Sequence, residues 1–82
     1  MDQFNLEKQY QLYLERGGIT ESQMHPIQKV ETKRAFMAAC GQMLILLRDD
    51  LGLLEVDKAI EQLQDMMNQV QAFWLKEANQ TN

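Results

Sequence analysis

The chain has 82 residues, 45% of them hydrophobic and 24% charged, with a formal net charge of -4 at pH 7. Chains of this length form one domain whose hydrophobic core is marginal and is commonly supplemented by self-association, metals or disulfides. One cysteine excludes an internal disulfide, and the negative charge argues against broad nucleic-acid binding, which requires a basic face.

Cysteine usage and the N-terminal residues predict where the protein resides. A lone thiol suits a reducing compartment, and residues 1–5 lack the basic-then-apolar pattern of a signal peptide. The longest apolar stretch is also too short to span a bilayer. We therefore expect a cytoplasmic protein without a membrane segment.

A first helix is predicted over residues 3–16. Asp2 is placed to cap its start, and the pair Gly17 and Gly18 supplies a left-handed stop at its end. Its apolar residues recur at intervals of three and four, namely Leu6, Tyr10, Tyr13 and Leu14. One face of this helix is therefore expected to pack against the rest of the protein.

A second helix is predicted over residues 26–49, with Pro26 first because proline lacks the amide hydrogen that a helix start leaves unpaired anyway. One turn earlier, Thr20-Glu21-Ser22-Gln23 matches a capping box. From Ala35 to Leu47 only Gln42 is strongly polar, so this helix is apolar on nearly every side. Such a helix has to be enclosed by other helices.

A third helix is predicted over residues 55–77, after a joint that contains Gly52. Its apolar residues form the clearest heptad pattern in the chain, namely Val56, Ile60, Leu63, Met67, Val70 and Trp74. Its opposite face is polar, and residues 78–82 are expected to fray. The predicted fold is an all-α, three-helix, bundle-like domain over residues 1–82 with a long, nearly all-apolar central helix.

Two flanking helices cover only part of such a central helix, so we expect oligomerisation to complete the domain. Burying a further ~800 Å² per subunit at roughly 25 cal/mol per Å² offers up to ~20 kcal/mol before the costs of association. Gly41 lies inside the second helix, where a glycine indicates that another group comes close to the backbone. That group is a crossing helix, a packed aromatic ring or a ligand in a groove. The residues predicted to form the oligomer interface are Met37, Gly41, Leu44, Ile45, Met67 and Trp74.

Residue types that carry covalent catalysis are scarce, with one histidine, one cysteine and one serine. His25 and Cys40 are separated by about 22 Å along a helix, which prevents a dyad within one subunit. Ser22 fits a helix cap, and Cys40 fits a small hydrophobic residue of the interior. Acidic residues around the second joint lack the spacing of a calcium loop. We therefore predict no enzymatic activity, no metal and no cofactor.

The start of the second helix contains a candidate binding site of five residues, His25, Gln28, Lys29, Lys33 and Arg34. The cations lie on neighbouring positions of one face, and the free amides of a helix start favour anions. This pattern predicts a site for a phosphate-bearing small ligand or for an acidic protein surface. The alternative is that the three cations only solvate the helix and pair with nearby carboxylates, namely Glu15, Glu21 or Glu31.

This short helical chain resembles small accessory proteins of bacteriophages and prophages, because it is rich in glutamine and methionine and has one His-Pro junction. The stretch His25-Pro26-Ile27-Gln28 before a cationic helix, with Trp74 on a later apolar face, is similar to small helical phage proteins that sequester cyclic nucleotides of anti-phage signalling. The resemblance implies an oligomer that holds its ligand between subunits. That family's tyrosine after the His-Pro-Gln stretch and its tryptophan-alanine-asparagine ending have no counterpart here.

These observations predict a non-enzymatic, self-associating helical binding protein, a phage or prophage accessory factor of the counter-defence type that captures a partner stoichiometrically. One alternative is a small-ligand sponge that sequesters an anionic, cyclic nucleotide at subunit interfaces. Another is a small DNA-binding regulator with the His25-Pro26 joint as the bend of a helix-turn-helix. Because the third helix is acidic and the second largely apolar, nucleic acid is not an expected partner.

Overall fold

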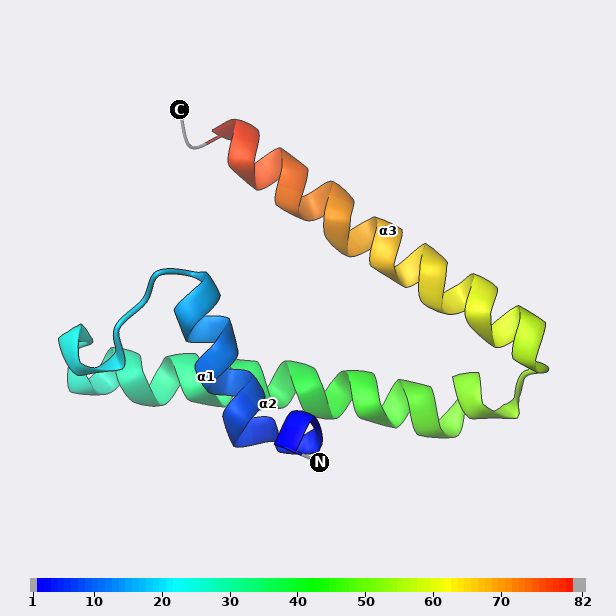
Figure 1. The fold of residues 1–82 in the computed structure, drawn as a ribbon, viewed down its shortest axis with the longest axis horizontal. Helices are drawn as coiled ribbons and strands as arrows, with labels where there is room; N and C mark the ends of the chain where they lie inside the picture. The colour runs from blue at the N-terminus through cyan, green and yellow to red at the C-terminus, as the bar shows by residue number, and fades with distance from the viewer. Residues whose placement is uncertain (1, 81–82) are drawn as a thin grey trace. The chain divides into compact units, whose positions relative to one another are not determined.

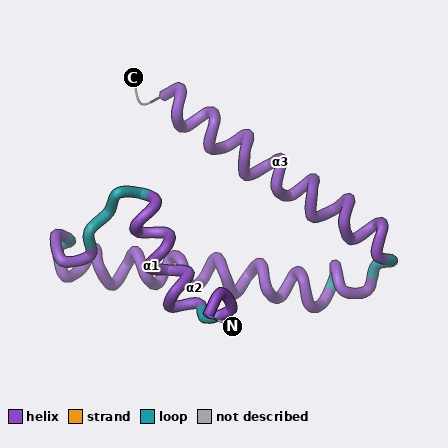
Figure 2. The backbone as a smooth tube through the Cα atoms, viewed as in Figure 1, coloured by secondary structure: helices purple, strands orange, loops and turns teal. Residues whose placement is uncertain are grey.

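The computed structural model describes residues 2–80, and all of the regular structure in that range is helical. Figure 1 shows three α-helices, α1 (Leu6–Arg16), α2 (Pro26–Asp49) and α3 (Val56–Gln80). A short 3-10 helix precedes each of them, namely η1 (Asp2–Phe4), η2 (Glu21–Gln23) and η3 (Leu51–Leu53). The links between helices are short (Figure 2). The prediction of an all-α chain with three helices is confirmed.

The chain divides into two compact units, Met1–Leu44 and Ile45–Asn82. The first unit contains α1, η2 and most of α2, and the second contains the last residues of α2 with η3 and α3. None of the helices within residues 2–80 combines the length and the apolar character needed to cross a lipid bilayer.

The start of α1 differs from the prediction. Asn5, and not Asp2, occupies the N-cap position, and its side-chain oxygen accepts a hydrogen bond from the Lys8 amide at 3.0 Å. Asp2 lies in η1, where its carboxylate is 3.6 Å from the Lys8 ammonium. Because asparagine and aspartate cap helices about equally well, the cap could not be assigned from residue type alone.

The end of α1 is closed by the predicted glycine pair. Gly18 has a φ of 66°, and its amide donates to the Glu15 carbonyl at 3.1 Å. The Ile19 amide donates to the Leu14 carbonyl at 2.9 Å. These two bonds form a Schellman motif, which satisfies carbonyls that the helix end leaves free. The predicted left-handed stop is confirmed.

The single turn predicted at Thr20-Glu21-Ser22-Gln23 is present as η2 with Thr20 at its N-cap, but the capping box predicted there does not form. Thr20 precedes η2, and its side chain makes no capping hydrogen bond. The backbone becomes extended at Met24, with a ψ of 143°, so no helix continues from η2 for a capping box to stabilise. The chain has to leave the helical region before a proline, and Pro26 then begins α2 as its first residue.

The second unit is built around the tight turn of η3. A Cβ at Gly52 would lie 3.2 Å from the Leu47 carbonyl oxygen, so a larger residue would crowd the turn. The Ala59 amide donates to the Glu55 carbonyl at 2.9 Å, and α3 then continues to Gln80. Residues 78–80 are therefore helical, against the prediction that they fray, whereas residues 81–82 lie outside the described range.

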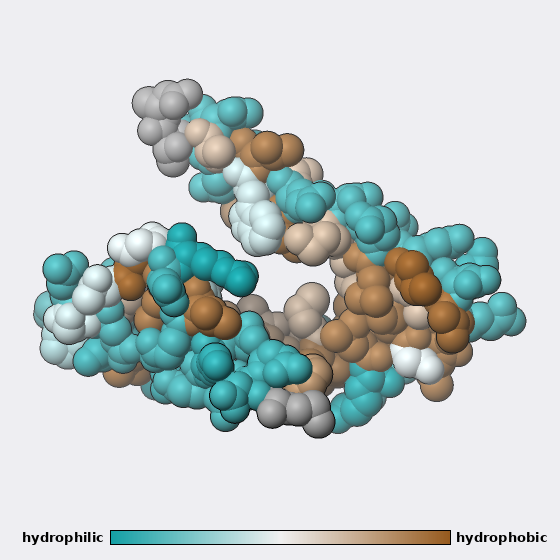
Figure 3. Space-filling view, viewed as in Figure 1, coloured by the Kyte–Doolittle hydropathy of each residue, from teal (hydrophilic) through white to brown (hydrophobic). Residues whose placement is uncertain are grey.

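Among the described residues the core is small, because only Tyr10 and Leu14 are buried. The Tyr10 ring centroid lies 5.3 Å from that of Phe36, and the Tyr13 ring lies at the same distance from Phe36. These contacts hold α1 where it crosses α2 (Figure 1). No side chain of residues 45–80 is buried, and Figure 3 shows hydrophobic side chains gathered at the surface around η3 and the start of α3.

Candidate functional site

Three of the five predicted anion-binding residues line one groove, which we call the basic groove. It has a volume of about 460 Å³ and lies between η2 and one face of α2, and its lining residues are Glu21, Lys29, Val30, Lys33, Arg34 and Met37. Lys29, Lys33 and Met37 follow one another at intervals of four, which places them on the same helix face. The structure thus brings together the three predicted cations, whereas His25 and Gln28 do not line the groove.

Lys33 is engaged with α1. Its ammonium lies 2.7 Å from the Glu7 carboxylate and 5.7 Å from the centroid of the Tyr10 ring. The hydrogen bond to Glu7 raises the pKa of Lys33, and the same bond lowers the pKa of Glu7. Both side chains are about half exposed, so solvent screens the pair. Lys33 therefore links α2 to α1 in addition to lining the groove.

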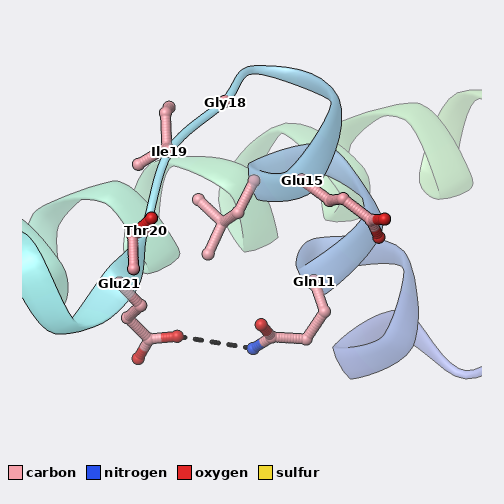
Figure 4. Close-up of a pocket in the computed structure, with 7 residues that line it drawn as sticks. Gln11, Glu15, Gly18, Ile19, Thr20 and Glu21 are labelled. Carbon is pink, nitrogen blue, oxygen red and sulfur yellow. Dashed lines mark hydrogen bonds between the residues drawn. The ribbon is translucent and has the colours of Figure 1, made fainter.

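Gln11 extends this ion pair into a chain of hydrogen bonds. Its side-chain amide donates to Glu7 at 3.3 Å and to Glu21 at 3.4 Å. Figure 4 shows Gln11 on α1 pointing across to Glu21 on η2. Because Glu21 lines the basic groove, the network connects the groove to α1.

Charges around the basic groove largely balance. The Arg34 guanidinium lies 3.5 Å from the Glu31 carboxylate, with both side chains mostly exposed. Within residues 2–80 the Lys29 ammonium has no hydrogen bond or ion pair. Three cations therefore stand near three carboxylates, Glu7, Glu21 and Glu31, which weakens the attraction that an anion meets there. The alternative to a binding site was that these cations pair with Glu15, Glu21 or Glu31. The pair with Glu31 is present.

His25 caps α2. Its Nδ1 accepts a hydrogen bond from the Ile27 amide at 3.2 Å, and its carbonyl accepts one from the Lys29 amide at 2.9 Å. The first bond satisfies one of the amides that a helix start leaves unpaired, and the second is the first regular hydrogen bond of α2. The prediction assumed that the amides of this helix start are free for an anion, and the structure shows that the Ile27 amide is not. Gln28 is exposed on the same turn.

Tyr10 has no exposed surface, and its hydroxyl finds no hydrogen-bond partner among the residues described. Burial is the main cause that raises the pKa of Tyr10, followed by the negative charge of Glu21. The helical periodicity placed Tyr10 on an apolar face, but no sequence signal indicated that its hydroxyl would be unpaired.

A second cavity, of about 490 Å³, lies in the second unit and is lined by Leu46, Asp50, Leu51, Leu54, Gln62 and Met66. The sequence predicted only that acidic residues gather around this joint. One of them, Asp49, accepts two hydrogen bonds from Arg48, at 2.6 and 3.0 Å, which lower the pKa of Asp49. The signal that could have indicated the cavity is the group of leucines between residues 51 and 54.

The predicted interface residues are mostly exposed. Leu44, Ile45, Met67 and Trp74 expose between 40% and 59% of their surface. Met37 is half-buried in the lining of the basic groove. Within residues 2–44, a Cβ at Gly41 would meet no atom within 4 Å, so this unit places neither a helix crossing nor an aromatic ring over the glycine.

Within residues 2–80 no three His, Cys, Asp or Glu side chains lie close enough together to hold a metal ion. Cys40 is half-buried and unpaired. Comparisons with protein-family models, with curated proteins and with solved structures find no match for this chain. A function therefore has to be inferred from the residues and the geometry described above.

Proposed function

We propose that this chain is a non-enzymatic binding protein that assembles with copies of itself through exposed apolar faces of its helices. The observation that supports this is the imbalance between apolar content and burial. Hydrophobic residues make up 45% of the sequence, yet among the residues described only Tyr10 and Leu14 are buried. Extended apolar surface on a small protein marks a site of interaction with another macromolecule.

Two regions supply this surface. Met43, Leu44 and Ile45 are about half exposed on α2, and α3 exposes a longer series of apolar side chains. Full burial of one such side chain contributes roughly 1.5–3 kcal/mol, so a few of them offset the cost of association. A captured partner protein would use the same kind of helix contact.

Light scattering tests this proposal. At micromolar concentrations the native chain is expected to have a mass of at least two chains of 9.6 kDa each. Ile45→Asp is expected to lower that mass, because it places a charge in the apolar surface of α2. Gln28→Asp is the matched control, since it adds the same charge to an exposed polar position of the same helix, far from Ile45, and should leave the mass unchanged.

Circular dichroism has to show that Ile45→Asp keeps the helical content of the native chain. A native chain that stays monomeric throughout the micromolar range would contradict self-association.

A second candidate function is capture of a small phosphate-bearing ligand, including a cyclic nucleotide. It is supported by the way Lys29, Lys33 and Arg34 line one groove. An anion would compete with Glu7 for Lys33 and with Glu31 for Arg34, and it would meet no such competition at Lys29.

Thermal shift against inorganic phosphate and a panel of cyclic nucleotides tests this second function. Stabilisation is expected to disappear in Lys29→Ala and to persist in Lys58→Ala, which removes an exposed cation from α3. No shift with any of these ligands would reject ligand capture and leave self-association untouched.

A further inference from the structure

The α3 stripe, formed by Val56, Ile60, Leu63, Met67, Val70 and Trp74, is exposed along its whole length. Exposed fractions run from 40% at Met67 to 73% at Val56. Within the second unit, the residues around η3 share a cavity with Gln62 and Met66, which lie on the neighbouring face of α3. None of the six stripe residues is therefore buried by residues 45–80.

We infer that two copies of the chain pair through their α3 stripes in antiparallel orientation, with the two-fold axis at the level of Asp65. This inference rests on the self-association proposed above and adds its surface, orientation and register. In this register the opposing residues are Val56 with Trp74, Ile60 with Val70, and Leu63 with Met67.

Side-chain volumes favour this register. The inward-facing residues of a heptad alternate between the a and d positions. In this register each opposing pair consists of one residue at an a position and one at a d position. The largest side chain, Trp74, then meets the small Val56, and Ile60 meets the small Val70, so that the layers have similar volumes. In a parallel pair Trp74 would meet Trp74 and Val56 would meet Val56, which leaves layers of very different volume. Cores pack best when large and small residues oppose each other.

Charge also favours the antiparallel orientation. Glu77 occupies the next position of the heptad after Trp74, so a parallel pair would set two carboxylates directly against each other. Residues 56–65 contain three carboxylates and one lysine, whereas residues 70–80 contain only Lys76 and Glu77. Antiparallel pairing separates the two acidic halves and opposes the two helix dipoles, which lowers their repulsion.

The area is sufficient for a stable pair. The six stripe residues and the adjacent Phe73, which is 61% exposed, each offer on the order of 100 Å² of apolar surface. Pairing would then bury roughly 1,400 Å² over both copies, within the range of about 1,200–2,000 Å² for specific interfaces. A second copy is therefore large enough to cover the whole α3 stripe.

The surface is tested with a charge in the middle of the stripe. Leu63→Asp is expected to lower the mass measured by light scattering, because it removes pairing through α3, whereas Gln69→Asp, on the exposed polar face of α3, should leave the mass unchanged. A Leu63→Asp chain that keeps the native mass would overturn pairing through α3 and leave self-association standing. A native chain that is monomeric, because another segment of the same chain covers the stripe, would contradict both.

Orientation is tested with spin labels at Gln64→Cys and, separately, at Gln71→Cys, each in a Cys40→Ser background. Both glutamines are exposed and border the same edge of the stripe. In the antiparallel register the two labels at residue 64 are offset by only about 3 Å along the helix axis, and those at residue 71 by about 18 Å. The distance measured at residue 71 is therefore expected to be roughly 5–10 Å longer. Equal distances at the two sites would show a parallel pair and overturn the inference.

Discussion

The two units of the chain differ in whether their apolar side chains are buried. In the first unit, Tyr10 and Leu14 are buried, and the ring of Phe36 on α2 packs against Tyr10 and Tyr13 on α1. In the second unit no described side chain is buried, although α3 has the more regular apolar pattern. Regular periodicity predicts where a helix presents its apolar face, but it does not predict what covers that face.

The polar contacts differ in the same way. Within the first unit the Glu7–Lys33 ion pair at 2.7 Å joins α1 to α2. The ion pairs of the second unit connect neighbouring residues, Arg48 with Asp49 and Lys58 with Glu61. Side chains of the first unit thus specify one packing of two helices, whereas the described ion pairs of the second unit do not join α3 to another helix.

The largest expected effect comes from removing the core of the first unit. Leu14→Ala should lower the free energy of unfolding by about 2–5 kcal/mol, because Leu14 is only 3% exposed. Leu75→Ala, the same change at a position that is 67% exposed and lies off the α3 stripe, should change it by less than about 0.5 kcal/mol. Urea denaturation followed by circular dichroism measures both, and equal losses would remove the contrast between the units.

Trp74→Ala tests whether the second unit depends on a partner. If the α3 stripe forms the interface, this change weakens association by about 2 kcal/mol or more, which is roughly a 30-fold rise in the dissociation constant. Sedimentation equilibrium measures this constant. Hydrogen exchange of the α1 amides should not change, because α1 belongs to the other unit. An unaltered dissociation constant would place the interface elsewhere.

Two glycines provide effects of intermediate size and opposite sign. Gly18→Ala should cost roughly 1–2 kcal/mol, because its φ of 66° is strained for any residue with a Cβ. Gly41→Ala should stabilise by about 0.5–1 kcal/mol, since it improves a helix interior and its Cβ meets no atom within 4 Å. Thermal unfolding measures both. If Gly41→Ala instead reduces the mass seen by light scattering, Gly41 lies in the self-association surface, as its position in α2 predicted.

The smallest effect concerns pH and the first unit. Because Lys33 lowers the pKa of Glu7, the ion pair contributes stability above the ordinary glutamate pKa of 4.5, and this contribution is lost as the pH falls through the lowered value. Glu7→Gln should remove this part of the acid dependence and leave the rest, and Glu15→Gln is the control on the same helix. Unfolding curves between pH 7 and pH 3 measure the difference. Identical pH dependence in the native chain and Glu7→Gln would show that solvent screens the pair completely.

Local features of the chain were predictable wherever backbone chemistry permits few alternatives. Pro26 begins α2 and Gly18 ends α1 in the left-handed conformation, because each residue has a special backbone property. The N-cap at Asn5 was missed because Asp2 and Asn5 are both good caps and only the position of η1 decides between them. Of the candidate site, the three cations that share the basic groove were predictable from helical spacing alone.

The partners of those cations were not predictable. Glu7 and Lys33 are 26 positions apart in the sequence, and they meet only because α1 crosses α2 beside the Tyr10 ring. His25 likewise matched an anion site by residue type, yet in the structure its Nδ1 accepts the Ile27 amide and caps the helix. Residue type specifies which interactions a side chain can make, and the packing around it selects one of them.

The sequence by itself determined that this chain is all-α, where its glycines and proline end or begin helices, and which face of α3 is apolar. These features depend on contacts between residues a few positions apart, which local spacing encodes. Only the tertiary structure decided that Tyr10 and Leu14 form the core, that Lys33 pairs with Glu7, and that neither Gly41 nor the α3 stripe is buried within its own unit. Burial and long-range pairing depend on how separate helices approach each other, and that approach is set by the sum of many weak contacts that no single pattern in the sequence records.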